Sequence, residues 1–134
     1  MKVRKATEED RPFIEKLYRQ HKKELGSFNL FWSWDDYVAG KKKSTFVVIE
    51  GAGFMRYGFS KRYTAYVLHE IGVDDDWQRK GVGKVLFEHL PRPLLVKCNC
   101  ENERGNAFYE KMGMTKVGLS KTKKGVEQNL WWTT

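Results

Sequence analysis

The stretch from Tyr66 to Leu90 constrains the fold of this chain more than any other. Its first part, which ends at Val73, is apolar and rich in β-branched residues, and this predicts a β-strand. From Val82 onward, apolar residues recur at helical spacing. Between the two lies a turn with two glycines, where little side chain obstructs a ligand. A strand, a glycine turn and a helix N-terminus direct free backbone N–H groups at one point, an arrangement that binds phosphate.

The spacing of the glycines in this turn excludes two familiar phosphate-binding motifs. The turn lacks the Gly-Lys-Ser/Thr of a Walker loop and the third glycine of the Rossmann pattern. An ordinary strand-to-helix connection is the simplest alternative. The turn does resemble the pyrophosphate-binding signature of the GNAT superfamily of acyl-CoA N-acyltransferases, Gln/Arg-x-x-Gly-x-Gly/Ala, which is met here by Gln78, Gly81 and Gly83.

A second segment, from Asn102 to Met114, resembles the same family. It is similar to the GNAT pattern Asn-x-x-Ala/Gly-x-x-Phe/Leu-Tyr-x-x-x-Gly-Phe, with Gly105 where alanine is common and Met114 where phenylalanine is usual. The run Leu90-Pro91-Arg92-Pro93 beside Lys97-Cys98 is similar to small phage-type members. On these motifs the chain is identified as a GNAT superfamily N-acetyltransferase.

The remaining patterns predict a mixed α/β sandwich in which a central, mostly antiparallel sheet is flanked by helices. Strands are expected at residues 2–6, 45–49, 54–60, 64–73, 94–99, 114–119 and 126–132. Helices are expected from near Pro12 to before Gly26, around residues 31–37 from Ser33 or Asp35, at residues 82–90, and from Glu103 or Arg104 to Gly113. The order matches the GNAT fold, and residues 1–134 are expected to form a single domain.

Composition narrows the class of protein further. With 40% hydrophobic and 31% charged residues, no apolar run long enough to span a bilayer and no signal peptide, we expect a cytoplasmic protein without a membrane partner. Cys98 and Cys100 point the same way on a strand, so no disulfide between them and no zinc site is expected. The run Asp74-Asp75-Asp76 is interpreted as a solvated turn without a metal.

The formal net charge of +8 favours an anionic partner. That partner is the phosphates of a cofactor, a nucleic acid or an acidic surface. A competing hypothesis is therefore a non-catalytic module that keeps the fold and binds nucleic acid through Lys41–Lys43, Lys121–Lys124 and the aromatic segment before them.

The resemblance implies which residues hold an acyl-CoA. Backbone groups of Ile71, Gly72 and Val73 would hold the pantetheine arm as an added strand. The pyrophosphate site and the contacts to the cofactor arm would be formed by Gln78, Arg79, Lys80, Gly81, Val82, Gly83, Lys84, Asn102 and Asn106. Tyr109 would stand near the thioester sulfur, where its hydroxyl can protonate the departing thiolate. An aromatic packed in the core is the alternative for Tyr109.

An attacking amine must also lose a proton, and two residues of the central strand are candidate bases. His69 shares the parity of Val67 and Ile71, and some GNAT amine acetyltransferases carry a catalytic histidine at the matching place. Glu70 is the second candidate, because a bulge expected in this strand can change which way a residue faces. Without the bulge, adjacent strand residues face opposite ways, so only one of the two would face the acceptor.

The aromatic segment before the second strand is the candidate acceptor wall. Phe31, Trp32 and Trp34 are expected either to stack on a flat substrate such as a nucleobase or simply to cap the core.

The predicted function is transfer of an acetyl group from acetyl-CoA, or another acyl group from its acyl-CoA, to a primary amine by direct transfer in a ternary complex. The acceptor is a small amine, a protein amino group or an amine on a modified nucleic acid. The protein acts as a monomer or homodimer.

Overall fold

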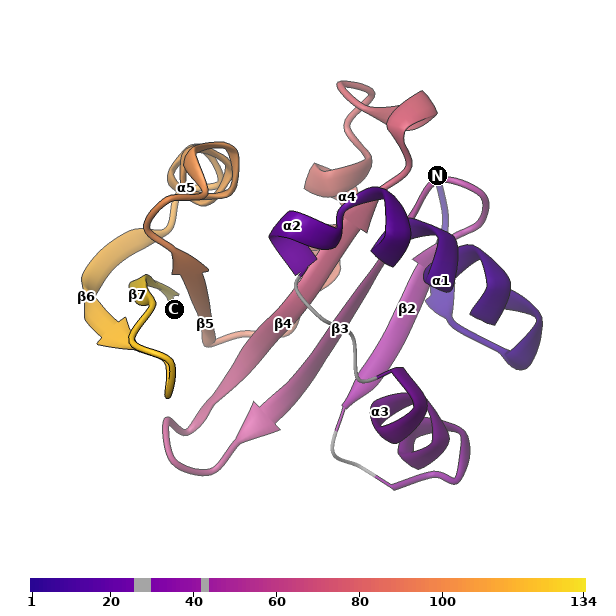
Figure 1. The fold of residues 1–134 in the computed structure, drawn as a ribbon, viewed down its shortest axis with the longest axis horizontal. Helices are drawn as coiled ribbons and strands as arrows, with labels where there is room; N and C mark the ends of the chain where they lie inside the picture. Colours follow the sequence, from indigo (N-terminus) through magenta and orange to yellow (C-terminus); the bar gives the residue numbers. More distant parts are fainter. Residues whose placement is uncertain (26–29, 42–43) are drawn as a thin grey trace.

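A seven-stranded sheet in the order β1-β2-β3-β4-β5-β7-β6 forms the centre of the molecule (Figure 1). The computed structural model describes residues 1–25, 30–41 and 44–134, and only the backbone of residues 30–32. The strands are β1 (Val3–Lys5), β2 (Thr45–Ile49), β3 (Gly53–Ser60), β4 (Ala65–Val73), β5 (Leu94–Asn99), β6 (Thr115–Lys121) and β7 (Glu127–Thr133). The helices are η1 (Glu8–Asp10), α1 (Arg11–Gln20), α2 (Lys22–Leu25), α3 (Leu30–Val38), η2 (Asp75–Trp77), α4 (Val82–His89) and α5 (Glu103–Lys111).

The predicted mixed α/β sandwich with a mostly antiparallel sheet is confirmed. Strands β1 to β4 pair antiparallel in order, and β5, β7 and β6 do the same. Among the described strands, only β4 and β5 pair in parallel, with α4 in the connection between them. That pairing stops at Leu68↔Val96, and beyond it the two strands diverge (Figure 1).

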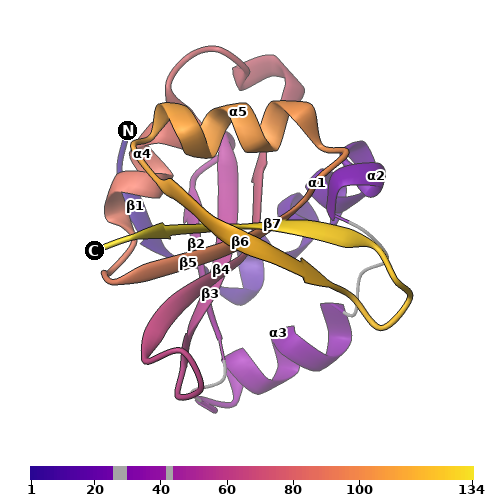
Figure 2. The ribbon, with the colours of Figure 1, turned by 90° about the vertical axis from the view of Figure 1, so that its left-hand side faces the viewer.

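Each face of the sheet is covered by its own apolar core. Alternate residues of β2 supply both cores: Val47 and Ile49 pack toward α4 and α5, whereas Phe46 and Val48 pack toward α1 and α3. A strand buried on both faces reads as continuous apolar sequence, which explains why this segment was recognisable. Figure 2 shows the β6–β7 hairpin crossing the near side, with α5 above it and α3 below.

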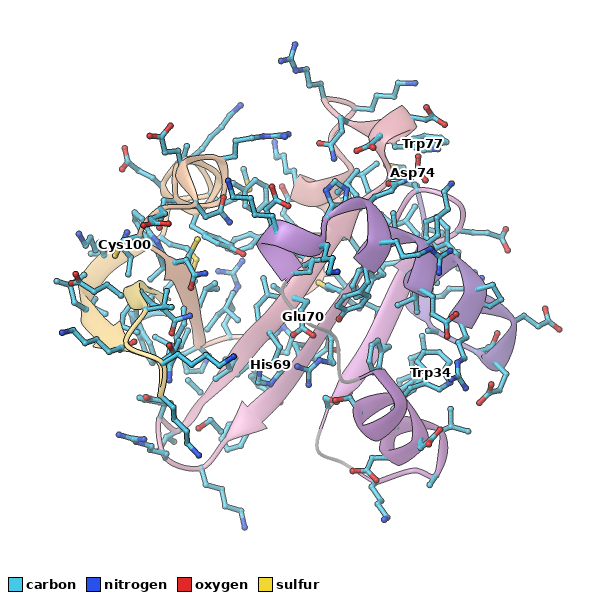
Figure 3. All side chains as sticks on the ribbon, in the orientation of Figure 1. Trp34, His69, Glu70, Asp74, Trp77 and Cys100 are labelled. Atoms are coloured by element: carbon cyan, nitrogen blue, oxygen red, sulfur yellow. The ribbon has the colours of Figure 1, made fainter. Side chains whose placement is uncertain are left out.

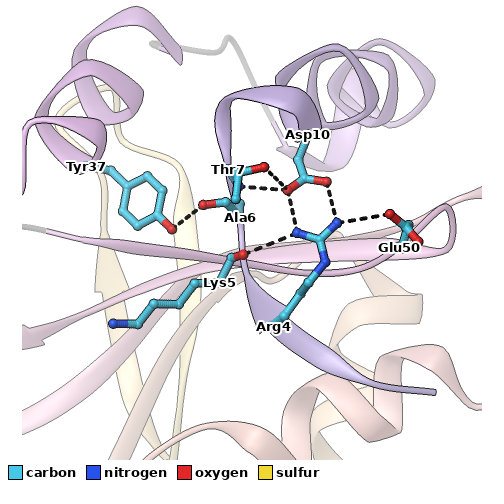
Figure 4. Close-up of polar contacts among 7 residues, drawn as sticks. All are labelled: Arg4, Lys5, Ala6, Thr7, Asp10, Tyr37 and Glu50. Atoms are coloured by element: carbon cyan, nitrogen blue, oxygen red, sulfur yellow. Dashed lines mark hydrogen bonds and ion pairs between the residues drawn. The ribbon is translucent and has the colours of Figure 1, made fainter.

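A polar network fixes the N-terminal segment to the sheet (Figure 4). Arg4 donates two hydrogen bonds to the Asp10 carboxylate, at 2.7 and 2.9 Å, and a third to Glu50 at 3.3 Å. The hydrogen bond from Arg4 holds the pKa of Asp10 below its usual value. The Tyr37 hydroxyl donates to the Ala6 carbonyl at 2.6 Å, which ties α3 to the same segment.

Two predicted helices differ from the observed ones. The first helix was expected to run unbroken to Gly26, but the chain leaves helical geometry at His21, where Nε2 donates to the Val73 carbonyl at 2.8 Å. The second was expected to begin at Ser33 or Asp35, but α3 begins at Leu30. In the described part of the chain, no helix is both apolar and long enough to cross a bilayer.

Candidate active site

The site is organised by the far end of β4, where one edge of the strand has no neighbour. Along an antiparallel strand, the backbone groups of every second residue point toward the neighbouring strand. Asp74 N donates to Ala52 O at 2.8 Å, so Asp74 is one of the residues that point toward β3. The backbone groups of Ile71 and Val73, which alternate with it, therefore point away from β3. On that side β5 has already diverged. An extended ligand can therefore add to this edge by main-chain hydrogen bonds.

Two side chains already occupy one group of this edge. The Val73 carbonyl accepts hydrogen bonds from Gln78 Nε2 at 2.9 Å and from His21 Nε2 at 2.8 Å. Gln78 Oε1 in turn accepts from Arg104 at 3.4 Å. The amide of Gln78 therefore links the turn to the end of β4 and to α5. Sequence reasoning assigned Gln78 to the cofactor and did not foresee this internal role.

The glycine turn leaves the beginning of α4 open. Gly81 is the N-cap residue with φ of 82°, a conformation that favours glycine, and no side chain that the structure describes caps the helix. A Cβ built on Gly81 would meet nothing within 4 Å. Among the described residues, no backbone carbonyl accepts from the N–H groups of Val82, Gly83 and Lys84. These donors, together with the positive end of the helix dipole, fit an anionic group.

The two asparagines of the second motif differ in whether their side-chain donors are already hydrogen-bonded. Asn102 Oδ1 accepts from Gly105 N at 2.9 Å and so caps α5, while its Nδ2 has no partner among the described residues. The Asn106 amide is fully used: Nδ2 donates to the carbonyls of Asn99 and Asn102, and Oδ1 accepts from Asn129 and Trp131. Asn106 thus clamps α5 to β5 and β7 and has no donor left for a cofactor arm.

Tyr109 is buried among aromatic rings but keeps a free hydroxyl. Its side chain belongs to the core beneath α4, with the Phe87 ring 6.5 Å away, and only 7% of the residue is exposed. Burial, together with the neighbouring Cys98, raises the pKa of the Tyr109 phenol, so the hydroxyl stays protonated. Within the described chain it has no hydrogen-bond partner, which leaves it available as a donor.

A bulge in β4 places both candidate bases on one face. Arg56 pairs with Glu70 but Tyr57 pairs with Leu68, so His69 is the extra residue. Leu68 and Ile71 both pack against the core beneath α4, although three positions apart. The bulge expected in this strand is therefore present, and it removes the alternation that would have turned only one of the two residues toward the acceptor. Figure 3 shows these two side chains side by side on β4.

Glu70 is held by two residues that sequence reasoning missed. Arg56 Nε and Nη2 donate to its two carboxylate oxygens at 3.0 and 2.8 Å, and the Tyr18 hydroxyl donates at 2.6 Å. Burial raises the pKa of Tyr18, which keeps it a donor. Arg56 lies opposite Glu70 on β3 and Tyr18 lies on α1, so no local sequence signal joins the three.

His69 carries a neutral imidazole at physiological pH. Part of the ring reaches solvent, yet the surrounding protein desolvates it, and this lowers its pKa to about 4, with the Arg56 guanidinium adding to the effect. In the described chain His69 makes no hydrogen bond. Of the two candidate bases, it is the one whose side chain makes no hydrogen bond to the described protein.

Two other expectations are changed by the structure, and a third lies outside the described residues. Trp34 is fully buried, packs on Phe46 with ring centroids 5.1 Å apart and donates to Glu8 at 3.2 Å, so it caps the core and presents no face to an acceptor. The side chains of Phe31 and Trp32 lie outside the described residues. Asp74 was interpreted as part of a solvated turn, but only 3% of it is exposed, because it caps η2 and pairs with Lys16 Nζ at 2.8 Å.

Among the described residues, neither a reactive thiolate nor a cluster of metal ligands is found at the site. Burial raises the pKa of the Cys98 thiol to about 11, which makes it a poor nucleophile. The exposed Cys100 donates to Asn129 Oδ1 at 3.4 Å. No cluster of three or more potential metal ligands occurs among the described residues. A hollow of about 510 Å³ is lined by Cys100 and by residues of α5 and β7, including Glu110. Its lining includes no residue of β4, so it is separate from the β4 edge.

Comparison with known proteins identifies the class of protein that this fold and site define. Residues 42–115 match the model of the acetyltransferase (GNAT) domain. The chain belongs to the GNAT family, whose members are acyl-CoA-dependent N-acetyltransferases. It is similar to the 5-NmdU N-acetyltransferase of Pseudomonas phage PaMx11, with 33% identity over 130 residues that cover 88% of this chain and 89% of the phage protein.

Solved structures of other acetyltransferases share the fold. The ribosomal-protein-S18-alanine N-acetyltransferase of Escherichia coli aligns over 98% of this chain and 90% of its own, with 20% identity and a TM-score of 0.71. The protein yncA of Salmonella typhimurium, solved with its cofactor acetyl-CoA, aligns over 100% of this chain and 93% of its own, with 16% identity and a TM-score of 0.73.

Proposed function

We propose that this protein transfers an acetyl group from acetyl-CoA directly to a primary amine on a modified nucleobase of the 5-NmdU kind. The observation that carries the transfer chemistry is the unpaired edge of β4, which runs from the open start of α4 to the bulge at His69. The choice of a nucleobase rests on the similarity to the phage 5-NmdU N-acetyltransferase.

The described residues fit an acyl-CoA. The N–H groups at the start of α4 and the open space over Gly81 suit its pyrophosphate, and the free backbone groups of Ile71 and the Val73 N–H suit the amides of the pantetheine arm. Asn102 Nδ2 is a further donor on the α5 side. When bound, acetyl-CoA supplies an acetyl group activated as a thioester.

The amine would meet this donor at the bulge. The Glu70 carboxylate, fixed by Arg56, attracts the substrate ammonium, and His69 accepts the proton that the amine must lose. A pKa near 4 makes the free imidazole a weak base, but it is neutral and partly open to water, so it can relay the proton to solvent. Backbone N–H groups of β4 stabilise the oxyanion, and the free Tyr109 hydroxyl protonates the departing thiolate.

Direct transfer agrees with the state of the thiols. A covalent acyl-enzyme on cysteine needs a thiolate, and burial keeps the Cys98 thiol protonated. We therefore assign the chemistry to one ternary complex.

The test uses acetyl-CoA labelled in its acetyl group and three acceptors offered separately. These are a duplex oligonucleotide that contains 5-aminomethyl-deoxyuridine, spermidine, and a peptide with a free N-terminus. We expect label in the modified oligonucleotide, none in the matched oligonucleotide with thymine, and none with the Gly81→Val protein. Label only in spermidine or the peptide would overturn the nucleobase assignment, and acetyl-CoA binding without transfer to any of the three would overturn the proposed acceptor class.

A further inference from the structure

A group of cations beside the candidate base has no carboxylate partner in the described part of the chain. The basic hairpin surface consists of Lys61, Arg62 and Tyr63, in the turn between β3 and β4, and Lys97 on β5. The Arg62 guanidinium and the Lys97 ammonium both lie over the Tyr63 ring, 5.3 and 5.2 Å from its centroid. Lys61, Arg62 and Lys97 are exposed. Two elements far apart in sequence thus form one basic and aromatic surface.

The charge of this surface is not neutralised within the protein. In the described chain, no carboxylate lies within ion-pair distance of Lys61, Arg62 or Lys97, and the sequence from Phe54 to His69 contains no acidic residue. Some cations elsewhere are paired, such as Arg4 with Asp10 and Lys16 with Asp74. Unpaired cations held near one another repel, so a bound anion stabilises the arrangement.

The surface adjoins the site. Lys97 is close enough to His69 for its charge to contribute to the lowered pKa of the imidazole. It projects from the same face of the sheet, because its neighbours Val96 and Cys98 pack into the core beneath α4. An anion bound at Lys97 and the hairpin turn would therefore lie next to the attacking amine.

From this position we infer that the basic hairpin surface binds backbone phosphates of the nucleic acid that carries the acceptor base, so the enzyme acts on a polynucleotide rather than on a free nucleoside. The inference rests on the proposed function. Lysine and arginine serve as phosphate contacts without reading sequence, and Tyr63 offers a ring face to a sugar or base beside the reacting nucleotide. Specificity for the modified base then comes from the acceptor end of β4.

The experiment compares Lys61→Gln/Arg62→Gln with Lys2→Gln/Lys5→Gln, a control with the same loss of charge at two exposed lysines of the N-terminal segment. Binding of a fluorescent duplex containing 5-aminomethyl-deoxyuridine is measured by anisotropy across a salt series, and acetylation is measured with the duplex and with the free nucleoside. We expect the hairpin variant to raise the KM for the duplex about tenfold. It should also reduce the slope of log K against log salt by about 2, since each phosphate contact contributes roughly 0.9.

The control and the free nucleoside decide the outcome. The inference holds if the control variant leaves duplex KM and salt slope near wild-type values and if the hairpin variant acetylates the free nucleoside normally. It is overturned if both variants weaken duplex binding equally, or if the hairpin variant leaves the salt slope unchanged. Anisotropy measures duplex binding without turnover. If the wild-type protein acetylates no nucleobase, the proposed function fails, but the anisotropy measurement still shows whether this surface binds DNA.

Discussion

The two ends of β4 are built in different ways. At the donor end, near Val73 and Gly81, the groups that fit the ligand are backbone N–H donors exposed by a turn. At the acceptor end, His69 and Glu70 depend on side chains from β3 and α1. The comparison teaches that main-chain geometry can hold the acyl donor. The acyl acceptor, in contrast, is selected by side chains that the tertiary fold brings together.

The largest effect is expected from Gly81→Val. A β-branched residue is strained at a φ of 82°, and its side chain would fill the space over the open N–H groups. We expect kcat/KM for acetyl-CoA to fall about 100-fold or more, equivalent to roughly 2.7 kcal/mol. Isothermal titration with CoA and steady-state kinetics measure this.

Gly125→Val is the matched control for backbone strain. Gly125 also has positive φ, at 83°, and open space around it, but lies in the β6–β7 turn. Equal losses in both variants would show that strain, not the pyrophosphate site, limits activity.

Tyr109→Phe tests the proton donor that we propose at the donor end. Loss of a proton donor to the leaving thiolate should lower kcat by about 100-fold. Because the hydroxyl has no described protein partner, the urea midpoint should stay close to that of the wild type. Tyr66→Phe removes another hydroxyl for which the structure shows no hydrogen bond, and should leave kcat unchanged. A Tyr109→Phe protein with normal kcat would return this residue to a packing role.

Arg56→Met tests the acceptor end through stability. The side chains of Arg56 and Glu70 are 20% and 13% exposed, so removing the guanidinium leaves a largely buried carboxylate without its main partner. We expect a loss of about 2 kcal/mol in the free energy of unfolding, measured with urea. The double variant Arg56→Met/Glu70→Leu should recover most of this stability but not amine transfer. Recovery of both would contradict a role for Glu70 at the acceptor.

The smallest effect concerns pH. His69 titrates near 4 when folded and near its ordinary 6.5 when unfolded, so the unfolded chain binds more protons between these values. This contribution lowers the free energy of unfolding as pH falls from 7 to 5. We expect His69→Gln to give a shallower pH dependence over this window in urea unfolding. His89→Gln, at the exposed end of α4, controls for loss of a histidine, and identical slopes for wild type and His69→Gln would contradict the lowered pKa.

Much of the fold and of the donor end could be predicted because their signals are local. The glycine turn, the apolar runs of β2 and β5 and the capping asparagine Asn102 each express a conformational preference within a few residues. The strand predictions Thr45–Ile49 and Leu94–Asn99 are confirmed at both ends.

Tertiary structure alone decided the acceptor end. The bulge at His69 depends on register against β3, and the hydrogen bonds of Glu70 join residues from β3, β4 and α1. Likewise, the four hydrogen bonds of Asn106 and the complete burial of Trp34 arise from packing between distant segments. The sequence by itself determined which turn exposes backbone donors, since glycine sets local φ. Which side chains meet at the acceptor was left to long-range pairing, because register and burial depend on neighbours that local sequence does not specify.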